Sequence, residues 1–92
     1  MAFVNVEASF TIYDSYSLKD KRSTVKSLIE RLSKRHNVSM AEVENQDMLN
    51  VSTIGIACVN SSSQLARKMV EKVLAEMEEQ YEIEIFDIHW YE

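Results

Sequence analysis

The chain consists of two halves, and each half runs from a segment with strand-like alternation to one with helical spacing and then to a second strand-like segment. Period two places successive side chains on opposite faces of a strand, whereas spacings of three and four residues mark one face of a helix. The order of segments is strand, helix, strand, strand, helix, strand. In 92 residues this order leaves room for one core only, so it limits the possible folds more than any other feature does.

The first half begins with an alternating strand that buries one face. Its apolar side consists of Val4, Val6, Ala8, Phe10 and Ile12. The next segment predicts a helix over residues 18–36, because Ser17 and Asp20 have capping-box spacing and apolar residues recur at helical intervals. Asn37 is expected to end this helix in the left-handed conformation. A short strand over residues 39–44 follows.

The second half predicts a strand over residues 51–59, a capped helix and a final strand. The apolar stripe of that helix consists of Leu65, Met69, Val70, Val73, Leu74 and Met77. In the last segment, residues 82–91, Ile83 and Ile85 begin an alternation that Phe86 continues one residue out of phase. Either a bulge or a strand that is apolar on both faces explains this slip.

Two right-handed strand–helix–strand units on one sheet predict the fold class. We expect an α+β ferredoxin-like split β-α-β sandwich over residues 1–92, with a four-stranded antiparallel sheet and two helices on one face. No signal-peptide pattern and no apolar run of about 20 residues occurs, and Cys58 has no second cysteine to pair with. We therefore expect a cytoplasmic protein.

Basic residues are concentrated in the predicted first helix. Residues 19–35 hold seven of the ten Lys and Arg and two acidic residues, so their net charge is +5. Since the whole chain has a net charge of −5, the remaining residues have a net charge of −10. At 100° per residue, Lys19, Arg22 and Lys26 share one flank, and Lys21 lies across the apolar stripe. The helix dipole disfavours cations near the start of a helix, so Lys19, Lys21 and Arg22 require another role. We expect Lys19, Lys21, Arg22 and Lys26 to contact RNA or an acidic partner; a solvated helix face is the alternative.

No catalytic residue, metal site or cofactor is predicted. Gly55 is the only glycine, which excludes the glycine-rich loops that hold phosphates. His36 has no ligand partner at a metal-binding spacing, and His89 has only Asp87, two residues before it; two groups do not make a metal site. Asp14, Asp47 and His36 are the only groups with loosely suitable chemistry for an enzyme. We therefore expect a protein that is not an enzyme.

The predicted last strand carries an apolar and aromatic set of residues, Phe86, Ile88, Trp90 and Tyr91. Exposed apolar patches of this kind mark interfaces. These residues predict a homodimer through the sheet face or an edge strand, unless a bulge returns them to the core. An acidic run over residues 76–84 offers a second route to self-association, with the basic helix of another copy.

Two segments resemble the YlxP-like family of small bacterial proteins, a domain of unknown function: residues 17–23, Ser-Leu-Lys-Asp-Lys-Arg-Ser, and residues 37–43, Asn-Val-Ser-Met-Ala-Glu-Val. Gln46-Asp47 and residues 54–57 extend the resemblance over nearly the whole chain. It implies the ferredoxin-like fold and, from neighbouring genes for transcription-elongation and ribosome-maturation factors, a setting with RNA or the ribosome. Many members have a tryptophan after this Gln-Asp pair and a basic residue before the third strand. Residues 48–52, Met-Leu-Asn-Val-Ser, have neither, so that basic contribution is missing in this chain.

Together these features predict a non-enzymatic, homodimeric binding protein that contacts RNA or a ribosome-associated particle through its basic first helix. The central strands expose no aromatic residue for base stacking, so phosphate contacts are expected. The alternative is a dimeric protein-interaction or regulatory module that binds an acidic protein partner. No contact with a membrane is expected.

Overall fold

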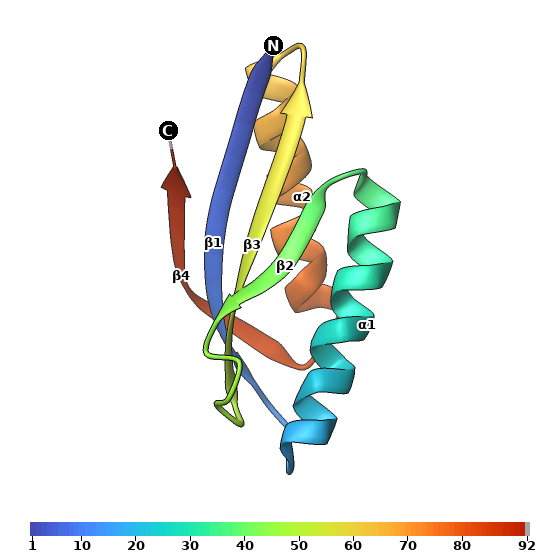
Figure 1. The fold of residues 1–92 in the computed structure, drawn as a ribbon. Helices are drawn as coiled ribbons and strands as arrows, with labels where there is room; N and C mark the ends of the chain where they lie inside the picture. Colours follow the sequence, from blue (N-terminus) through green and yellow to red (C-terminus); the bar gives the residue numbers. More distant parts are fainter. Residues whose placement is uncertain (92) are drawn as a thin grey trace.

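The computed structural model describes residues 1–91, and its elements follow the predicted order (Figure 1). They are β1 (Ala2–Ile12), α1 (Leu18–His36), β2 (Ser39–Glu44), β3 (Val51–Asn60), α2 (Ser63–Gln80) and β4 (Ile83–Tyr91). The strands form one antiparallel sheet in the order β2-β3-β1-β4. Because α2 packs on β1 and β3 and α1 packs on β2 from the same side, the predicted ferredoxin-like sandwich is confirmed and the other face of the sheet is open.

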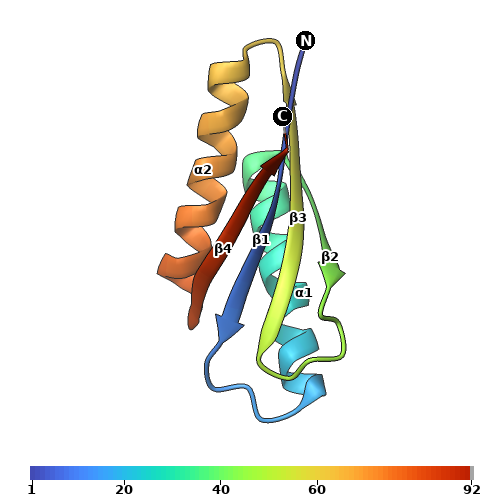
Figure 2. The ribbon, with the colours of Figure 1, turned by 90° about the vertical axis from the view of Figure 1, so that its left-hand side faces the viewer.

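The two ends of the sheet differ in what they bring together. The N-terminus and the end of β4 lie at one end of the sheet (Figures 1 and 2). The start of α1 lies at the other end, beside the turn that joins β2 to β3. The basic residues near the start of α1 are therefore neighbours of that turn.

The core lies between the sheet and the two helices. From β1 it takes Val6, Ala8, Phe10 and Ile12, and from β3 it takes Ile54, Ile56 and Cys58. From α1 it takes Val25, Leu28 and Leu32. α2 contributes the apolar stripe expected of it, with one difference: Leu65 is 53% exposed and Ala66 is buried in its place. Within residues 1–91, neither helix combines the length and the apolar character that crossing a membrane requires.

The predicted helix ends are confirmed. The Ser17 hydroxyl accepts a hydrogen bond from the Asp20 backbone N–H at 3.1 Å and begins α1. Asn37 ends α1 in the left-handed conformation, with φ 53° and ψ 49°. Ser62 begins α2 in the same manner as Ser17, since its hydroxyl accepts from the Leu65 N–H at 3.2 Å.

A β-bulge explains the slip of alternation in the last strand. Ser9 of β1 pairs with Asp87, but the next residue, Phe10, pairs with Ile85, so Phe86 is the extra residue of β4. A second irregularity in β2 leaves Val43 without a partner between Glu42 and Glu44. Of the two explanations that the sequence left open for β4, the bulge is the observed one.

Candidate functional site

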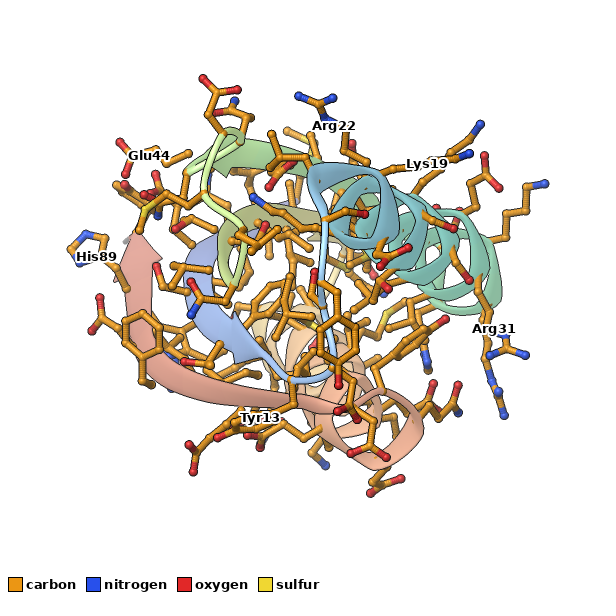
Figure 3. The ribbon with its side chains drawn as sticks, turned by 90° about the horizontal axis from the view of Figure 1, so that it is seen from below. Tyr13, Lys19, Arg22, Arg31, Glu44 and His89 are labelled. Atoms are coloured by element: carbon orange, nitrogen blue, oxygen red, sulfur yellow. The ribbon has the colours of Figure 1, made fainter. Side chains whose placement is uncertain are left out.

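An exposed cationic flank lies at the start of α1. Lys19, Arg22 and Lys26 are all exposed, and Figure 3 shows Lys19 and Arg22 pointing outward from this end of the helix. Arg22 Nη2 lies 3.9 Å from the Asp47 carboxylate, with side chains 63% and 95% exposed. A pair this exposed contributes little, so it does not fix Arg22 in place. These three residues form the basic flank.

Lys21, which the sequence grouped with them, does not belong to the basic flank. Its side chain is fully buried, and Nζ lies 3.1 Å from Glu42 Oε2 on β2. Nζ also donates to the backbone carbonyls of Asn45 and Gln46 in the β2–β3 turn. A lysine ammonium has three N–H donors, and all three have acceptors at this position. Lys21 lies on the apolar side of α1, so its side chain points into the protein and is not available to a partner.

The four residues predicted for a dimer interface lie around the β4 edge but not on one face. Ile88 and Trp90 pair with Ala8 and Val6, whose side chains face the helices, whereas Tyr91 pairs with Asn5 on the open face. Phe86, Ile88 and Tyr91 are 59%, 40% and 47% exposed. Trp90 is half-buried, and the Arg67 guanidinium lies 4.1 Å from its ring centroid. Their role in dimerisation stays a prediction.

The groups with loosely suitable enzyme chemistry are not brought together. Asp14 lies in the β1–α1 loop and Asp47 in the β2–β3 turn, whereas His36 lies at the opposite end of the 19-residue α1. His36 Nε2 lies 2.8 Å from Glu76 Oε2 on α2, a partner that the sequence spacing did not reveal. This hydrogen bond is the largest cause that lowers the pKa of Glu76 below its usual value, and the charges of His36, Arg35 and Lys72 add to it. Among residues 1–91, no three potential ligands are grouped to hold a metal ion.

The sequence analysis considered the open face of the sheet only for base stacking and for dimerisation, and it missed the anionic charge and the groove on this face. Its exposed or half-buried carboxylates include Glu7, Glu44 and Asp87, and a groove of about 340 Å³ lies beside Gly55. The signal was present in the sequence: all ten Lys and Arg fall in the two helices, and the described strands contain none. The domain therefore has cations over its helices and only anionic or neutral side chains on its open face.

The fold and this charge distribution define a small α+β domain with oppositely charged sides. The chain belongs to the family described as "Protein of unknown function (DUF503)", whose model matches residues 3–90. It is 38% identical over 78 residues, 85% of each chain, to the "Uncharacterized protein YlxP" of Bacillus subtilis (strain 168). These matches confirm the resemblance seen in the sequence.

A solved structure described as "Structural Genomics, protein YJCS" has a similar fold. Its TM-score with this chain is 0.65 at 12% identity, over 99% of this chain and 98% of that one. At this identity the likeness shows the fold alone.

Proposed function

We propose that the protein is a non-enzymatic binding protein that contacts RNA or a ribonucleoprotein through the basic flank, Lys19, Arg22 and Lys26. The observation that carries this proposal is a set of three exposed cations on one flank of α1. Two of them, Lys19 and Arg22, lie near the helix start, where the helix dipole disfavours cations. Among residues 1–91, only the weak Arg22–Asp47 pair engages any of them. Their charges are therefore free to neutralise phosphates.

The contact would be made to the phosphate backbone, without base readout. The central strands present Asn5, Glu7, Gly55 and Ala57 on the open face, and none of these side chains stacks a base. For three phosphate contacts on single-stranded RNA, the slope of log affinity against log salt should be about −2. The net charge of −5 opposes indiscriminate adhesion, so binding would be local to α1. We place this role in the cytoplasm, since Cys58 needs no oxidising compartment.

The test is sedimentation of the tagged protein in cell lysate through a sucrose gradient, at low and high salt, with and without ribonuclease. The test variant is Lys19→Glu/Arg22→Glu/Lys26→Glu. The control variant, Lys34→Glu/Lys68→Glu/Lys72→Glu, changes the net charge equally at three exposed lysines outside the basic flank. Near-ultraviolet circular dichroism establishes that both variants are folded.

Co-migration with ribosomal particles that ribonuclease and the test variant abolish, and that the control variant retains, is the expected result. A protein that stays at the top of the gradient in every condition would contradict the proposal. A complex that resists ribonuclease but dissociates at high salt would instead favour the alternative, an acidic protein partner held by the same three residues.

We also propose self-association through the β4 edge, which is supported by the exposure of Phe86 and Ile88 on a strand that ends the sheet. The variant Phe86→Ser/Ile88→Ser should sediment as a monomer. The control variant Met48→Ser/Leu49→Ser removes two similarly exposed apolar residues from the β2–β3 turn and should sediment with the mass of the wild-type dimer. A wild-type protein that is monomeric at all concentrations in analytical ultracentrifugation would exclude this dimer.

A further inference from the structure

A groove of about 340 Å³ lies on the open face of the sheet, away from the two helices. Ala41 of β2 and Gly55 and Ala57 of β3 line it with little or no side chain, and the larger Val43 and Tyr91 lie beside them. The face is unpartnered, because both helices pack on the other side of the sheet. The groove therefore has room for an apolar side chain of a binding partner.

The shape of this groove follows from one bulge and one glycine. The bulge in β2 directs Val43 over Gly55, where a Cβ atom would come 3.3 Å from Val43 Cγ1. Tyr91 crosses from the edge strand and donates a hydrogen bond to the Glu7 carboxylate on β1. His89 packs edge-on against the Tyr91 ring at 4.4 Å between centroids. The contacts with Glu7 and His89 hold the Tyr91 ring in a defined position, and the missing side chain of Gly55 leaves open space beside Val43.

The charges around this groove are all of one sign. Glu7, Glu44 and Asp87 lie at open-face positions of β1, β2 and β4, and no Lys or Arg occurs in any described strand. The hydrogen bond to Glu7 raises the pKa of Tyr91, and the charges of Glu7 and Glu44 add to it. Figure 3 shows Glu44 and His89 on one side of the molecule and Lys19 and Arg31 on the opposite side. The open face thus contains an apolar groove that is surrounded by acidic side chains.

This combination selects the chemistry of the occupant. Nucleic acid is repelled, and the same face of a second copy brings like charges together. We infer that the open face docks a basic peptide segment of a protein partner, with an aliphatic side chain in the groove above Gly55 and Lys or Arg side chains against Glu44 and Asp87. The surface is separate from the basic flank, so this inference does not depend on RNA binding.

The test is a ¹⁵N NMR titration of the full chain. The probe is a short synthetic peptide that alternates Lys and Val, compared with a Glu–Val analogue and a Lys–Ser analogue. Gly55 is the only glycine in the chain, so its amide signal is an unambiguous marker at the groove. We expect the Lys–Val peptide to shift Gly55, Ala41 and Ala57, the Lys–Ser peptide to bind more weakly, and the Glu–Val peptide to leave all three signals unchanged.

Two kinds of variant separate charge from shape. Glu44→Lys/Asp87→Lys should weaken Lys–Val binding about tenfold at low salt, whereas Glu79→Lys/Glu82→Lys, an equal charge change at exposed positions off the strands, should change it less than about twofold. Ala57→Leu fills the groove from its half-buried position and should also weaken binding, without altering net charge.

Three results would overturn the inference. The first is Lys–Val shifts confined to the helices, with Gly55 unmoved. The second is equal binding by the Glu–Val peptide. The third is a Gly55 signal that moves with protein concentration alone in the Phe86→Ser/Ile88→Ser variant, which lacks the β4-edge dimer, because the occupant would then be a second copy of the chain.

Discussion

Lys21 of α1 and Glu42 of β2 form a buried ion pair that links the helix start to the edge strand, with 3.1 Å between Nζ and Oε2. The Ser52 hydroxyl donates to the same Glu42 oxygen at 2.6 Å, and Lys21 also holds two carbonyls of the β2–β3 turn. Every charge and donor in this group therefore has a partner. A buried pair of this kind positions the turn, and its neighbours Arg22 and Lys19 then face outward.

Lys21→Met should destabilise the fold by about 3 kcal/mol, because it leaves the Glu42 carboxylate without its counter-ion and two turn carbonyls without a donor. Urea unfolding at neutral pH measures this loss. Lys19→Met, at an exposed position in the first turn of the same helix, should change stability by less than about 0.5 kcal/mol.

The double variant Lys21→Met/Glu42→Leu should recover the part of that loss that comes from the unpaired carboxylate, since it removes both charges and fills the space with apolar side chains. The two turn carbonyls stay without a donor, so the recovery should be incomplete. If the double variant is as unstable as the sum of the two single variants, the pair contributes no coupling. Lys21 and Glu42 would then stabilise the fold independently, and their ion pair would not be what holds the turn.

Local patterns were sufficient to predict the elements but not this pair. The bounds of α1 and the caps at Ser17 and Asn37 depend on residues that lie within a few positions of one another, so the sequence contains the information. In β2 the apolar Ala41 is exposed on the open face, and the acidic Glu42 faces α1 instead. An acidic residue faces the helix here because it pairs with Lys21, which is distant in the sequence, so the pattern of β2 alone could not predict its orientation.

The register of β4 is a second feature that local patterns could not predict. Counting alternate residues reveals that a slip exists near Phe86, but not which residue is extra, because the register is set by pairing with Ser9 and Phe10 of β1. The anionic character of the open face was also missed for a reason of this kind. Its anionic character follows from residues on β1, β2 and β4 that are adjacent only in the sheet.

The Glu76–His36 contact predicts a loss of stability in acid. The pKa of Glu76 is lowered in the folded protein, so its contribution is present above its usual pKa of 4.5 and is lost as pH falls through the lower folded value. Glu76→Gln should therefore lower the thermal midpoint at neutral pH. The difference from the wild type should shrink as pH falls below 4.5.

Thermal unfolding followed by circular dichroism over a pH series checks this. Glu79→Gln, at an exposed position on the same helix, should give a curve parallel to the wild type at every pH. A constant offset between Glu76→Gln and the wild type down to the most acid pH would rule out the linkage.

The left-handed conformation of Asn37 determines which residues the end of α1 should tolerate at this position. Its φ of 53° lies in the left-handed region, and its backbone N–H donates to the Ser33 carbonyl. Asn37→Gly should leave stability within about 0.5 kcal/mol of the wild type, whereas Asn37→Val should cost about 1–2 kcal/mol, because a β-branched residue is strained there. Urea unfolding of both variants tests this. Equal stabilities for the glycine and valine variants would show that α1 ends differently in solution.

Gly55 allows a prediction about the tightest contact of the open face. A Cβ at this position would lie 3.3 Å from Val43 Cγ1, so Val43 must shift by a few tenths of an ångström to admit it. Val43 is 41% exposed at a bulge and can make this shift. Alanine also reduces the freedom of the unfolded chain, which favours folding by about 0.5–1 kcal/mol. We therefore expect the single substitution Gly55→Ala, with Val43 unchanged, to leave the free energy of unfolding nearly the same as in the wild type.

The same substitution should be stabilising, by about 0.5 kcal/mol, once Val43→Ala has removed the neighbour. Urea unfolding of the two single variants and the double variant closes the thermodynamic cycle. A coupling between the two positions assigns the close contact to Val43. If Gly55→Ala instead costs more than about 1 kcal/mol in both backgrounds, the obstacle is the Ala41 backbone, whose carbonyl oxygen lies 4.0 Å from the added Cβ, and the groove is more rigid than the bulge implies.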